Sequence, residues 1–356
     1  MSRLRRFRDS FTGLDVDGML IVNPENRRYL SNFSGSSGVL LVNPESAHIV
    51  TDFRYWEQVS VEVAEFELFK QGPDLWKSIV ELIGALKWKR IGFEPESLTF
   101  KEYQNLLSVS SGGLELIPVS EGVENLRRAK EPDEVKLLAE AAKITDLAWH
   151  KTLALIKPGV KESEIGLEFD YQLRLNGAEG CAFTTIIASG ARGALPHGHA
   201  TDKTVNPGDL IVMDGGALFK GYHADMTRTV VLGKATPEQR KVYKIVLEAQ
   251  EKALAALKAG VIGKDIDAIA RDHIRDKGYG QYFGHGLGHS VGLQIHEKPR
   301  LAPVEESEIP AGAAITVEPG IYLPEWGGVR IEDLVIVEDS GVKNLTGSPK
   351  KELMEL

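Results

Sequence analysis

Residues 209–217 read Asp-Leu-Ile-Val-Met-Asp-Gly-Gly-Ala, an apolar run that ends on the carboxylate of Asp214 beside two glycines. Such a run predicts a buried strand. Lys220 and Gly221 predict a turn, and residues 222–230, Tyr-His-Ala-Asp-Met-Thr-Arg-Thr-Val, predict a returning strand. Asp214 and Asp225 should therefore face each other across a hairpin, where two close carboxylates repel unless a cation lies between them.

A purely structural interpretation of this hairpin is also open. In that interpretation Asp225 bonds Thr227 or Arg228, and Asp214 caps the turn. The hairpin alone does not separate the two possibilities, so the rest of the chain has to decide between them.

A glycine-rich stretch further along the chain favours the chemical interpretation. Residues 282–297 read Tyr-Phe-Gly-His-Gly-Leu-Gly-His-Ser-Val-Gly-Leu-Gln-Ile-His-Glu, and they hold His285, His289 and His296 of the nine histidines in the chain. Glycine at this density predicts a loop rather than a helix or a central strand, and it lets backbone approach a ligand closely. Because neutral imidazole is a common metal ligand, three histidines in this setting indicate a functional site.

Two more apolar runs end on acids. Residues 314–320 read Ala-Ile-Thr-Val-Glu-Pro-Gly, which predicts a strand that places Glu318 before a Pro-Gly turn. Residues 327–335 read Gly-Gly-Val-Arg-Ile-Glu-Asp-Leu-Val, and a strand pattern puts Arg330 and Glu332 on the same face. A cation and a carboxylate should then share one site.

Together these segments supply four carboxylates and one imidazole. This set is rich in hard oxygen ligands, so Mn²⁺, Co²⁺, Fe²⁺ and Zn²⁺ are candidates, whereas a thiolate zinc site is excluded. Four acids exceed what one divalent cation neutralises, and two such cations can activate water and polarise a carbonyl together. The predicted chemistry is hydrolysis.

The chain has 356 residues, which favours two domains. Short strands are predicted at residues 18–22, 38–42, 47–51 and 90–93, with helical patterns between them, and Asn23-Pro24 and Asn43-Pro44 are interpreted as loops that close strands. A proline and acids at residues 131–134 predict the start of a long helix that reaches about residue 157. Further helices are predicted at 163–175, 237–259 and 264–277. We therefore expect an α/β (α+β) protein with domains at 1–126 and 127–356.

Composition limits the class of partner. The formal net charge of −9 disfavours nucleic acid, and no apolar run approaches the length of a membrane helix. The arginine-rich start predicts the solvated face of a first helix and no export signal, so a cytoplasmic protein is expected. Cys181 is the single cysteine, and its apolar neighbours favour a buried thiol over a nucleophile.

These residues resemble the metallopeptidases of the pita-bread fold, in particular the prolidase and aminopeptidase P branch. The resemblance rests on the spacing of the two aspartates, the His-Gly-x-Gly-His pattern ending at residue 289, Glu-Pro-Gly, and Arg-x-Glu. It implies two divalent metal ions per subunit, with Mn²⁺ or Co²⁺ ahead of Zn²⁺ or Fe²⁺. It also implies that Asp214 binds one metal, that His289 and Glu318 bind the other, and that Asp225 and Glu332 bridge them.

The resemblance also implies catalytic roles. Glu318 would handle the proton of a metal-bridging hydroxide, and Arg330 would give electrostatic support. His197 in Leu-Pro-His-Gly, His285 and His296 would contact substrate or stabilise the oxyanion. Ser290 departs from the pattern, since the family often has glycine after the ligand histidine, but this change removes no ligand.

The resemblance extends over the whole chain, including a creatinase-like N-terminal α/β domain that usually mediates dimerisation and borders the active site. A homodimer is therefore expected. Within that domain Asp52 and Arg54 occur in Thr-Asp-Phe-Arg-Tyr, a segment similar to one in prolidases. Their simpler interpretation is a local salt link at the end of a strand, so they are not assigned to the site.

The expected activity is hydrolysis of the bond between an N-terminal residue and proline in small peptides. The short chain favours an Xaa-Pro dipeptidase, with an Xaa-Pro aminopeptidase for longer peptides as the alternative. A methionine aminopeptidase generally lacks so large an N-terminal domain, and a creatinase-like enzyme would not keep all five ligands. A non-catalytic peptide-binding module is the remaining alternative. His197, His285, His296 and Tyr322 are candidates for the wall of a proline pocket.

Overall fold

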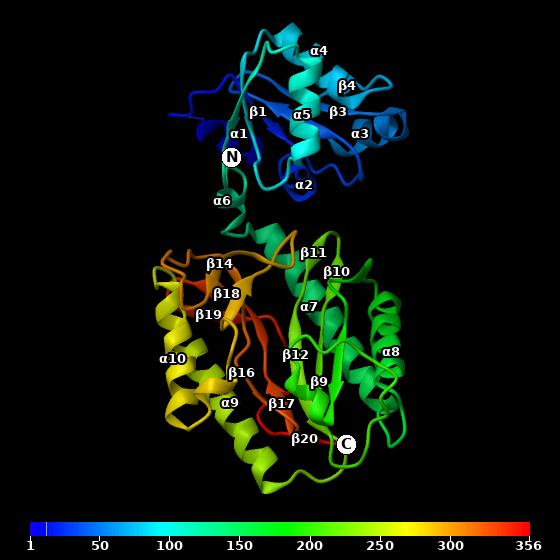
Figure 1. Cartoon of the computed structure of the whole chain (residues 1–356), viewed down its shortest axis with the longest axis vertical. Coiled ribbons are helices and arrows are strands. Elements are labelled where there is room, and N and C mark those ends of the chain that lie inside the picture. The colour runs from blue at the N-terminus through cyan, green and yellow to red at the C-terminus, as the bar shows by residue number, and fades with distance from the viewer. Residues whose placement is uncertain (12) are drawn as a thin grey trace. The chain divides into compact units, whose positions relative to one another are not determined.

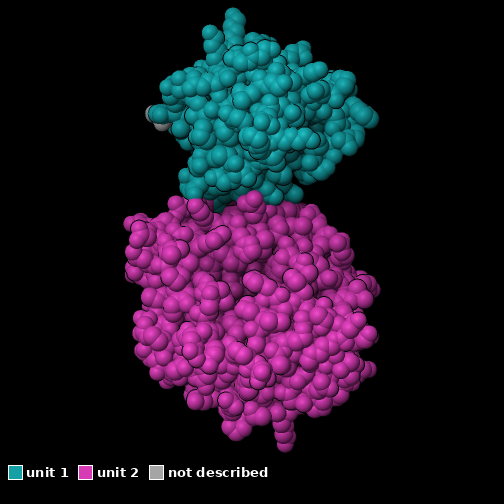
Figure 2. Space-filling model, in the orientation of Figure 1, with its two compact units in different colours: residues 1–127 teal, residues 128–356 magenta. Residues whose placement is uncertain are grey.

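The computed structural model describes residues 1–11 and 13–356. These residues form two compact units, Met1–Arg127 and Arg128–Leu356, which are coloured separately in Figure 2. Each unit has its own sheet and its own helices (Figure 1). Within the described ranges, no helix has the length and apolar character needed to cross a membrane.

The first unit contains a mixed six-stranded sheet with helices around it. Its strands are β1 (Gly18–Ile21), β2 (Val39–Val42), β3 (Ala47–Thr51), β4 (Glu67–Lys70), β5 (Arg90–Phe93) and β6 (Glu115–Pro118). Its helices are α1 (Arg3–Asp9), α2 (Pro24–Ser31), η1 (Phe53–Tyr55), α3 (Trp56–Glu62), α4 (Leu75–Leu86), α5 (Phe100–Val109) and α6 (Glu124–Arg127). The strand order is β4-β3-β2-β1-β5-β6. The four strands predicted in this region are confirmed to within one residue, because their apolar runs fill the buried centre of the sheet.

The prediction that Asn23-Pro24 marks a loop is wrong. Pro24 is the first residue of α2, and the Asn23 side chain accepts a hydrogen bond of 2.9 Å from the Asn26 backbone N–H. Asparagine at an N-cap and proline at the first helical position are both favourable, since the proline N–H would lack a partner there in any case. The pair therefore ends one element and begins the next.

The second unit contains the remaining helices and sheets. Its helices are α7 (Pro132–Thr152), η2 (Leu153–Leu155), α8 (Glu162–Leu175), η3 (Gly190–Ala194), α9 (Pro237–Ala256), α10 (Gly263–Asp276) and η4 (Gly280–Tyr282). Its first strands are β7 (Gly180–Cys181), β8 (Ile186–Ser189), β9 (Leu210–Gly215), β10 (Ala217–Phe219), β11 (Tyr222–His223) and β12 (Met226–Val231). Its later strands are β13 (Gly288–Ser290), β14 (Glu297–Leu301), β15 (Ala314–Val317), β16 (Gly320–Leu323), β17 (Gly327–Arg330), β18 (Asp333–Glu338), β19 (Gly341–Asn344) and β20 (Met354–Glu355).

The sheets of this unit lie on the inside and the long helices on the outside (Figure 1). α7 and α8 pack together beside β8 to β12, and α9 and α10 pack together beside the later strands. The main sheets have the orders β20-β12-β9-β8 and β14-β13-β15-β18-β19. Apolar side chains from α9 and α10 bury against the second of these, including Val246, Ile274, Ile315 and Val335. The four helices predicted here are confirmed, although α7 ends at Thr152 rather than near residue 157.

The predicted hairpin around Asp214 and Asp225 is present, with a second, smaller hairpin between its two strands. β9 pairs antiparallel with β12, while the chain between them makes the separate β10–β11 hairpin, whose turn holds Lys220 and Gly221 at φ 47° and 79°. The chain can pass from the larger hairpin to the smaller one because Gly216 has no side chain: a Cβ there would lie 1.7 Å from the Ala224 carbonyl oxygen. Asp214 at the end of β9 and Asp225 just before β12 therefore reach the same end of the sheet.

The prediction that the glycine-rich stretch forms only loop is wrong for residues 288–290. These residues form β13, which lies between β14 and β15 in the sheet. Gly288 is needed for close packing, since a Cβ there would lie 1.9 Å from the Thr316 carbonyl oxygen. His289 is consequently held on a paired strand rather than on a flexible loop.

Candidate metal centre

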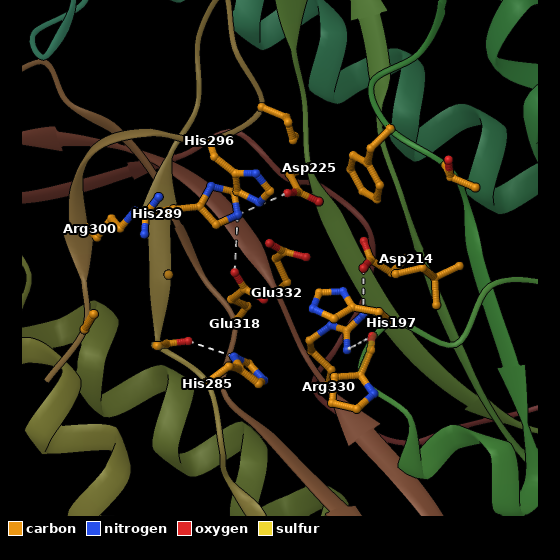
Figure 3. Close-up of a pocket in the computed structure, with 18 of the residues that line it drawn as sticks. His197, Asp214, Asp225, His285, His289, His296, Arg300, Glu318, Arg330 and Glu332 are labelled. Atoms are coloured by element: carbon orange, nitrogen blue, oxygen red, sulfur yellow. Dashed lines mark hydrogen bonds and ion pairs between the residues drawn. The ribbon is translucent and has the colours of Figure 1, made fainter. Parts of the chain in front are cut away.

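A cavity of about 610 Å³ opens in the second unit where the two main sheets approach each other (Figure 3). All of the residues predicted as ligands or catalytic groups line it. The lining consists of Phe183, Thr184, Ile186, Pro196, His197, His199, Asp214, Asp225, His285, Gly286, Gly288, His289, Ile295, His296, Arg300, Ala302, Glu318, Arg330 and Glu332. The structure thus brings together groups that are more than 130 residues apart in the sequence.

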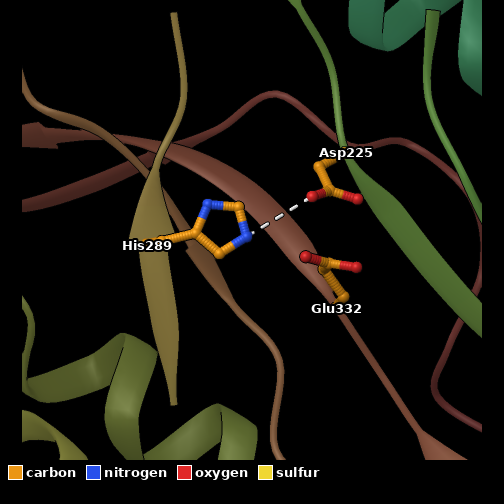
Figure 4. Close-up of side chains that lie close together, drawn as sticks. All are labelled: Asp225, His289 and Glu332. Atoms are coloured by element: carbon orange, nitrogen blue, oxygen red, sulfur yellow. Dashed lines mark ion pairs between the residues drawn. The ribbon is translucent and has the colours of Figure 1, made fainter. Parts of the chain in front are cut away.

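The five predicted metal ligands come from five segments of this unit. Asp214 ends β9, Asp225 precedes β12, His289 lies on β13, Glu318 follows β15, and Glu332 lies between β17 and β18. Ligand atoms of Asp225, His289 and Glu332 lie within 4.8 Å of one another (Figure 4). Nε2 of His289 is also 3.4 Å from Oε1 of Glu318, which adds a fourth ligand to this group.

The tautomer of His289 is fixed by the neighbouring backbone. Its Nδ1 lies 3.2 Å from the Ser290 carbonyl, which can only accept, so Nδ1 carries the proton and donates. Burial, together with the nearby His296, lowers the pKa of His289 to about 3, so the ring is neutral. Its Nε2 lone pair therefore points at Oδ2 of Asp225, 3.6 Å away, and at Oε1 of Glu318. Acceptor atoms face each other here, which requires protons or cations between them.

The carboxylates of this cluster need positive charge between them, supplied by protons or by cations. The side chains of Asp214, Asp225, Glu318 and Glu332 are largely buried, and Arg330 pairs with one of them, with its Nη2 2.6 Å from Oδ2 of Asp214. Burial first, and then repulsion from the neighbouring carboxylates, raises the pKa of Asp225 and of Glu332 well above the usual range. Burial likewise raises the pKa of Glu318 to about 8.

Three carboxylate oxygens of this cluster have no hydrogen-bond partner among the described residues: Oδ1 of Asp214, Oδ1 of Asp225 and Oε1 of Glu332. Buried oxygens are rarely left in this state, so they are suited to a ligand. The structural alternative for Asp225 does not fit, because Thr227 donates to Glu332 and Arg228 bonds the Thr227 and Glu332 carbonyls and Asp333. A hard, oxygen-rich donor set of this kind fits divalent metal ions.

Two threonines, to which the sequence interpretation gave no role in the metal cluster, hold its residues by hydrogen bonds. Thr227 donates to Oε2 of Glu332 at 2.7 Å and accepts from Nε of Arg330 at 2.9 Å. The Thr229 hydroxyl donates to the Arg330 carbonyl at 2.9 Å and accepts from the Arg330 backbone N–H at 3.1 Å. The alternation of residues 225, 227 and 229 along one strand face is the signal that could have found them. The predicted strand over residues 327–335 is interrupted in the structure: β17 ends at Arg330 and β18 begins at Asp333, so Glu332 lies between them, and both Arg330 and Glu332 line the cavity.

Tyr322 was predicted as a possible wall of a proline pocket, but it does not line the cavity. It is buried on β16, where its hydroxyl accepts from NH1 of Arg330 at 2.8 Å and lies 2.9 Å from Nε2 of His285. Nδ1 of His285 faces the Gly286 carbonyl at 2.8 Å, and burial lowers the pKa of His285 to about 4. His285 is therefore neutral, and its Nε2 accepts from Tyr322. Tyr322 connects His285 to Arg330 from outside the cavity.

His197, His296 and Arg300 are exposed residues of the cavity lining, with His197 beside Asp214 and Arg330, and His296 and Arg300 on the side of His289 (Figure 3). In residues 1–11 and 13–356, no hydrogen bond engages the imidazole of His197 or His296, and no carboxylate pairs with the Arg300 guanidinium. The His296 ring packs edge-on against His289, with 4.4 Å between centroids. Arg300 was missed in the sequence because a single exposed arginine on β14 gives no pattern.

Several other predicted features lie outside the cavity. Asp52 and Arg54 form the expected local salt link, with Nε 2.8 Å from Oδ1. Cys181 is half-buried rather than buried, and its burial raises the pKa of the thiol to about 11, so it is protonated at neutral pH and unsuited to nucleophilic attack. Ser290 is fully buried behind His289, so its side chain adds no obstacle to the cavity.

Sequence comparison identifies the family. Residues 136–339 match metallopeptidase family M24, and residues 3–129 match the creatinase/prolidase N-terminal domain. The chain belongs to metallopeptidase family M24. The prediction of a creatinase-like N-terminal domain followed by a pita-bread metallopeptidase domain is confirmed, as is the prediction of a metal-dependent peptidase.

Relatives of this M24 metallopeptidase match it over nearly the whole chain. An Xaa-Pro dipeptidase from Pyrococcus furiosus is 38% identical over 99% of this chain and 98% of its own. The solved structure of an Xaa-Pro dipeptidase from Bacillus anthracis is 42% identical, with a TM-score of 0.97 over 99% of both chains. That of an X-Pro aminopeptidase from Thermotoga maritima is 39% identical, with a TM-score of 0.90 over 98% of this chain and 100% of its own.

Removing the metal from this peptidase should destabilise it more at higher pH. In the metal-free protein the raised pKa of Asp225, Glu318 and Glu332 means that the folded state holds protons more tightly than the unfolded state does. Stability is then fully present below the ordinary carboxyl pKa of about 4 and falls as pH rises toward about 8, the pKa of Glu318. We expect the Tm difference between metal-loaded and chelated protein to grow from pH 5.5 to pH 8. A difference that shrinks with pH would contradict this account.

Proposed function

We propose that this M24 peptidase is an Xaa-Pro dipeptidase that uses two divalent cations, Mn²⁺ or Co²⁺ ahead of Zn²⁺ or Fe²⁺. Asp214 would hold one cation, His289 and Glu318 the other, and Asp225 and Glu332 would bridge them. The observation that carries the proposal is a buried cluster of four carboxylates in a cavity, three of which, those of Asp225, Glu318 and Glu332, lie close to Nε2 of His289. The similarity to two Xaa-Pro dipeptidases supports the choice of substrate.

When bound, the two cations would supply an activated water and polarise the scissile carbonyl. A side chain of the protein must then transfer a proton to the proline nitrogen, because this nitrogen leaves as an amine. Glu318 suits this role, since it lies at the cavity floor within 3.4 Å of His289 and is also contacted by Thr316 Oγ1 at 3.3 Å. It would accept the proton of the water and return it to the proline nitrogen.

Of the remaining groups, His285 and Arg330 support the site, whereas His197 and His296 can contact the substrate. His285 uses one ring nitrogen on the Gly286 carbonyl and the other on Tyr322, so it has no N–H left for a substrate and instead orients Tyr322 and Arg330. The imidazoles of His197 and His296 are exposed toward the cavity and can donate to a substrate carbonyl or to the developing oxyanion. Arg330 lies against Asp214 and limits the repulsion within the cluster.

Arg300 supports the dipeptidase choice. A dipeptide ends in a free proline carboxylate close to the scissile bond, whereas a longer peptide has an amide there. An exposed guanidinium on the cavity wall, without a carboxylate partner among the described residues, suits that carboxylate. The Xaa-Pro aminopeptidase remains the second candidate, since the similar Thermotoga maritima protein carries that name.

Replacing Arg300 with Met should therefore separate the two activities. With hydrogen bonds to charged groups contributing about 1.5–3 kcal/mol, kcat/KM for Xaa-Pro should fall roughly 10- to 100-fold, whereas slow cleavage of Xaa-Pro-amide should change less than about threefold. Lys298→Met is the matched control, because Lys298 is an exposed cation on the same face of β14 and does not line the cavity. Equal losses of kcat/KM on both substrates would show that Arg300 does not bind the proline carboxylate.

Turnover of Xaa-Pro and Xaa-Pro-Xaa, measured side by side after reconstitution with Mn²⁺, Co²⁺, Zn²⁺ or Fe²⁺, tests the proposed function itself. Preference for the dipeptide supports the dipeptidase, and preference for the tripeptide supports the aminopeptidase. Cleavage of neither, with any of the four metals, would favour the non-catalytic peptide-binding module. A cytoplasmic homodimer, with dimerisation through domain 1–126, remains our prediction for the assembly and location of the enzyme.

A further inference from the structure

We propose that Glu162 is a positioning residue that fixes His197 in the cavity by holding both ends of residues 189–201. Glu162 does not line the cavity and is fully buried at the first position of α8. The inference rests on the proposed function, because it treats His197 as a group that acts on the substrate. It adds to that function a buried carboxylate outside the metal cluster.

Both carboxylate oxygens of Glu162 are used by this segment. Oε1 accepts from the Ser189 backbone N–H and from its hydroxyl, each at 2.8 Å. Oε2 accepts from the Thr201 backbone N–H at 3.2 Å and from its hydroxyl at 2.8 Å, and it forms an ion pair with Arg192. One carboxylate therefore joins the two ends of a segment whose middle carries His197.

The backbone at the start of α8 strengthens this junction. The Glu162 N–H donates to the Lys203 carbonyl at 3.0 Å, and the Ser163 N–H donates to the Thr201 carbonyl at 2.9 Å. Lys203 in turn donates to the Ser189 hydroxyl at 2.8 Å. All of the side-chain partners of Glu162 are donors, so an amide in its place would turn one acceptor into a donor that faces Thr201 or Arg192.

The same segment is held on its other side by the strand that carries Arg330. NH1 of Arg330 donates to the Pro196 carbonyl at 3.2 Å. Gly193 packs so closely on β17 that a Cβ on Gly328 would lie 2.0 Å from the Gly193 carbonyl oxygen. The segment that Glu162 holds therefore also packs on β17, whose Arg330 donates to Asp214.

His197 needs this external support because its own imidazole makes no hydrogen bond in the part of the chain that the structure describes. Its side chain is exposed at the cavity wall, so its place relative to Asp214 and Arg330 is set by its backbone. A displacement of about 1 Å at a reacting group can cost about a hundredfold in rate. Loosening either end of residues 189–201 should therefore lower turnover without touching the metal ligands.

Glu162→Gln tests the inference. We expect kcat for Xaa-Pro to fall about tenfold, with KM within threefold and the metal content per subunit unchanged. In the metal-loaded protein, the amides of Ser189 and Thr201, which donate to Glu162, should exchange with solvent faster than in wild type. Glu168→Gln is the matched control: Glu168 lies on the same helix and binds only Gln172 in the described structure, so its kcat should not change.

A comparison with His197→Ala decides whether Glu162 acts through His197. If it does, adding Glu162→Gln to His197→Ala should lower kcat less than twofold further, whereas a tenfold further loss would overturn the inference. If Glu162→Gln does not fold, Thr201→Val removes one donor to the same oxygen and should give a smaller loss with the same non-additivity. Wild-type kcat in both variants would also overturn the inference while the proposed function stands. Wild-type protein that cleaves no Xaa-Pro would instead overturn the proposed function.

Discussion

Replacing Asp225 with Asn should lower kcat/KM for Xaa-Pro by roughly a thousandfold or more and release most of the bound metal. Asp225 is buried in the group that includes His289 and Glu332, and as a bridging ligand it would contribute charge to both cations. A neutral amide keeps the shape but loses that charge and places a donor where the cations are expected. Kinetics and metal analysis on the same protein sample measure the two losses together.

Two controls separate this effect from misfolding. Because Asp225→Asn removes one member of a repelling carboxylate cluster, the metal-free variant should have a Tm at least equal to that of metal-free wild type at pH 8. Asp52→Asn, which changes a carboxylate paired with Arg54 in the first unit, should keep metal and activity if Asp52 has only its local role. Full activity of Asp225→Asn with metal retained would contradict the assignment of Asp225 as a ligand shared by both cations.

Replacing Glu318 with Gln should reduce kcat by about a hundred- to ten-thousandfold, the range typical of a lost proton-transfer group. Gln keeps an oxygen for the cation but cannot take a proton from water and return it to the proline nitrogen. The site of Asp214 should be less affected, so the variant should retain at least one metal ion per subunit. This retention distinguishes it from Asp225→Asn.

Steady-state kinetics at saturating metal concentration, together with analysis of the bound metal, measures the loss of kcat and the retained metal in the same variant. The loss should appear in kcat and only weakly in KM, because Glu318 is assigned to the reaction and not to substrate binding. Near wild-type kcat in Glu318→Gln would move the proton-transfer role to another residue, for which His197 and His296 are the exposed candidates in the cavity.

Four of the ligand residues could be found in the sequence because each ends an apolar run or lies among glycines, and Asp225 was found as the partner of Asp214 across the predicted hairpin. Asp214 and Glu318 each follow buried strand residues, which is a local pattern visible without a structure. Their mutual placement is not local, since it depends on how two sheets approach. The prediction of a loop around His289 is wrong, because the strand there depends on a close contact between Gly288 and Thr316, which are far apart in the chain.

The supporting residues could not be predicted for a related reason. Tyr322 was expected to line the cavity, but its hydroxyl contacts His285 and Arg330, which line the cavity in its place. Glu162 lies 27 and 39 residues from the two ends that it holds, at a helix start that looks like any other acidic first turn. Hydrogen bonds over such separations leave no periodic pattern in a single sequence.

The most direct test of the account is a titration of chelated, metal-free enzyme with Mn²⁺ or Co²⁺, with Xaa-Pro turnover as the readout. The account predicts no turnover without metal and a rise that is complete near two equivalents per subunit. Turnover that survives complete metal removal, or two equivalents bound with no Xaa-Pro cleavage, would contradict it.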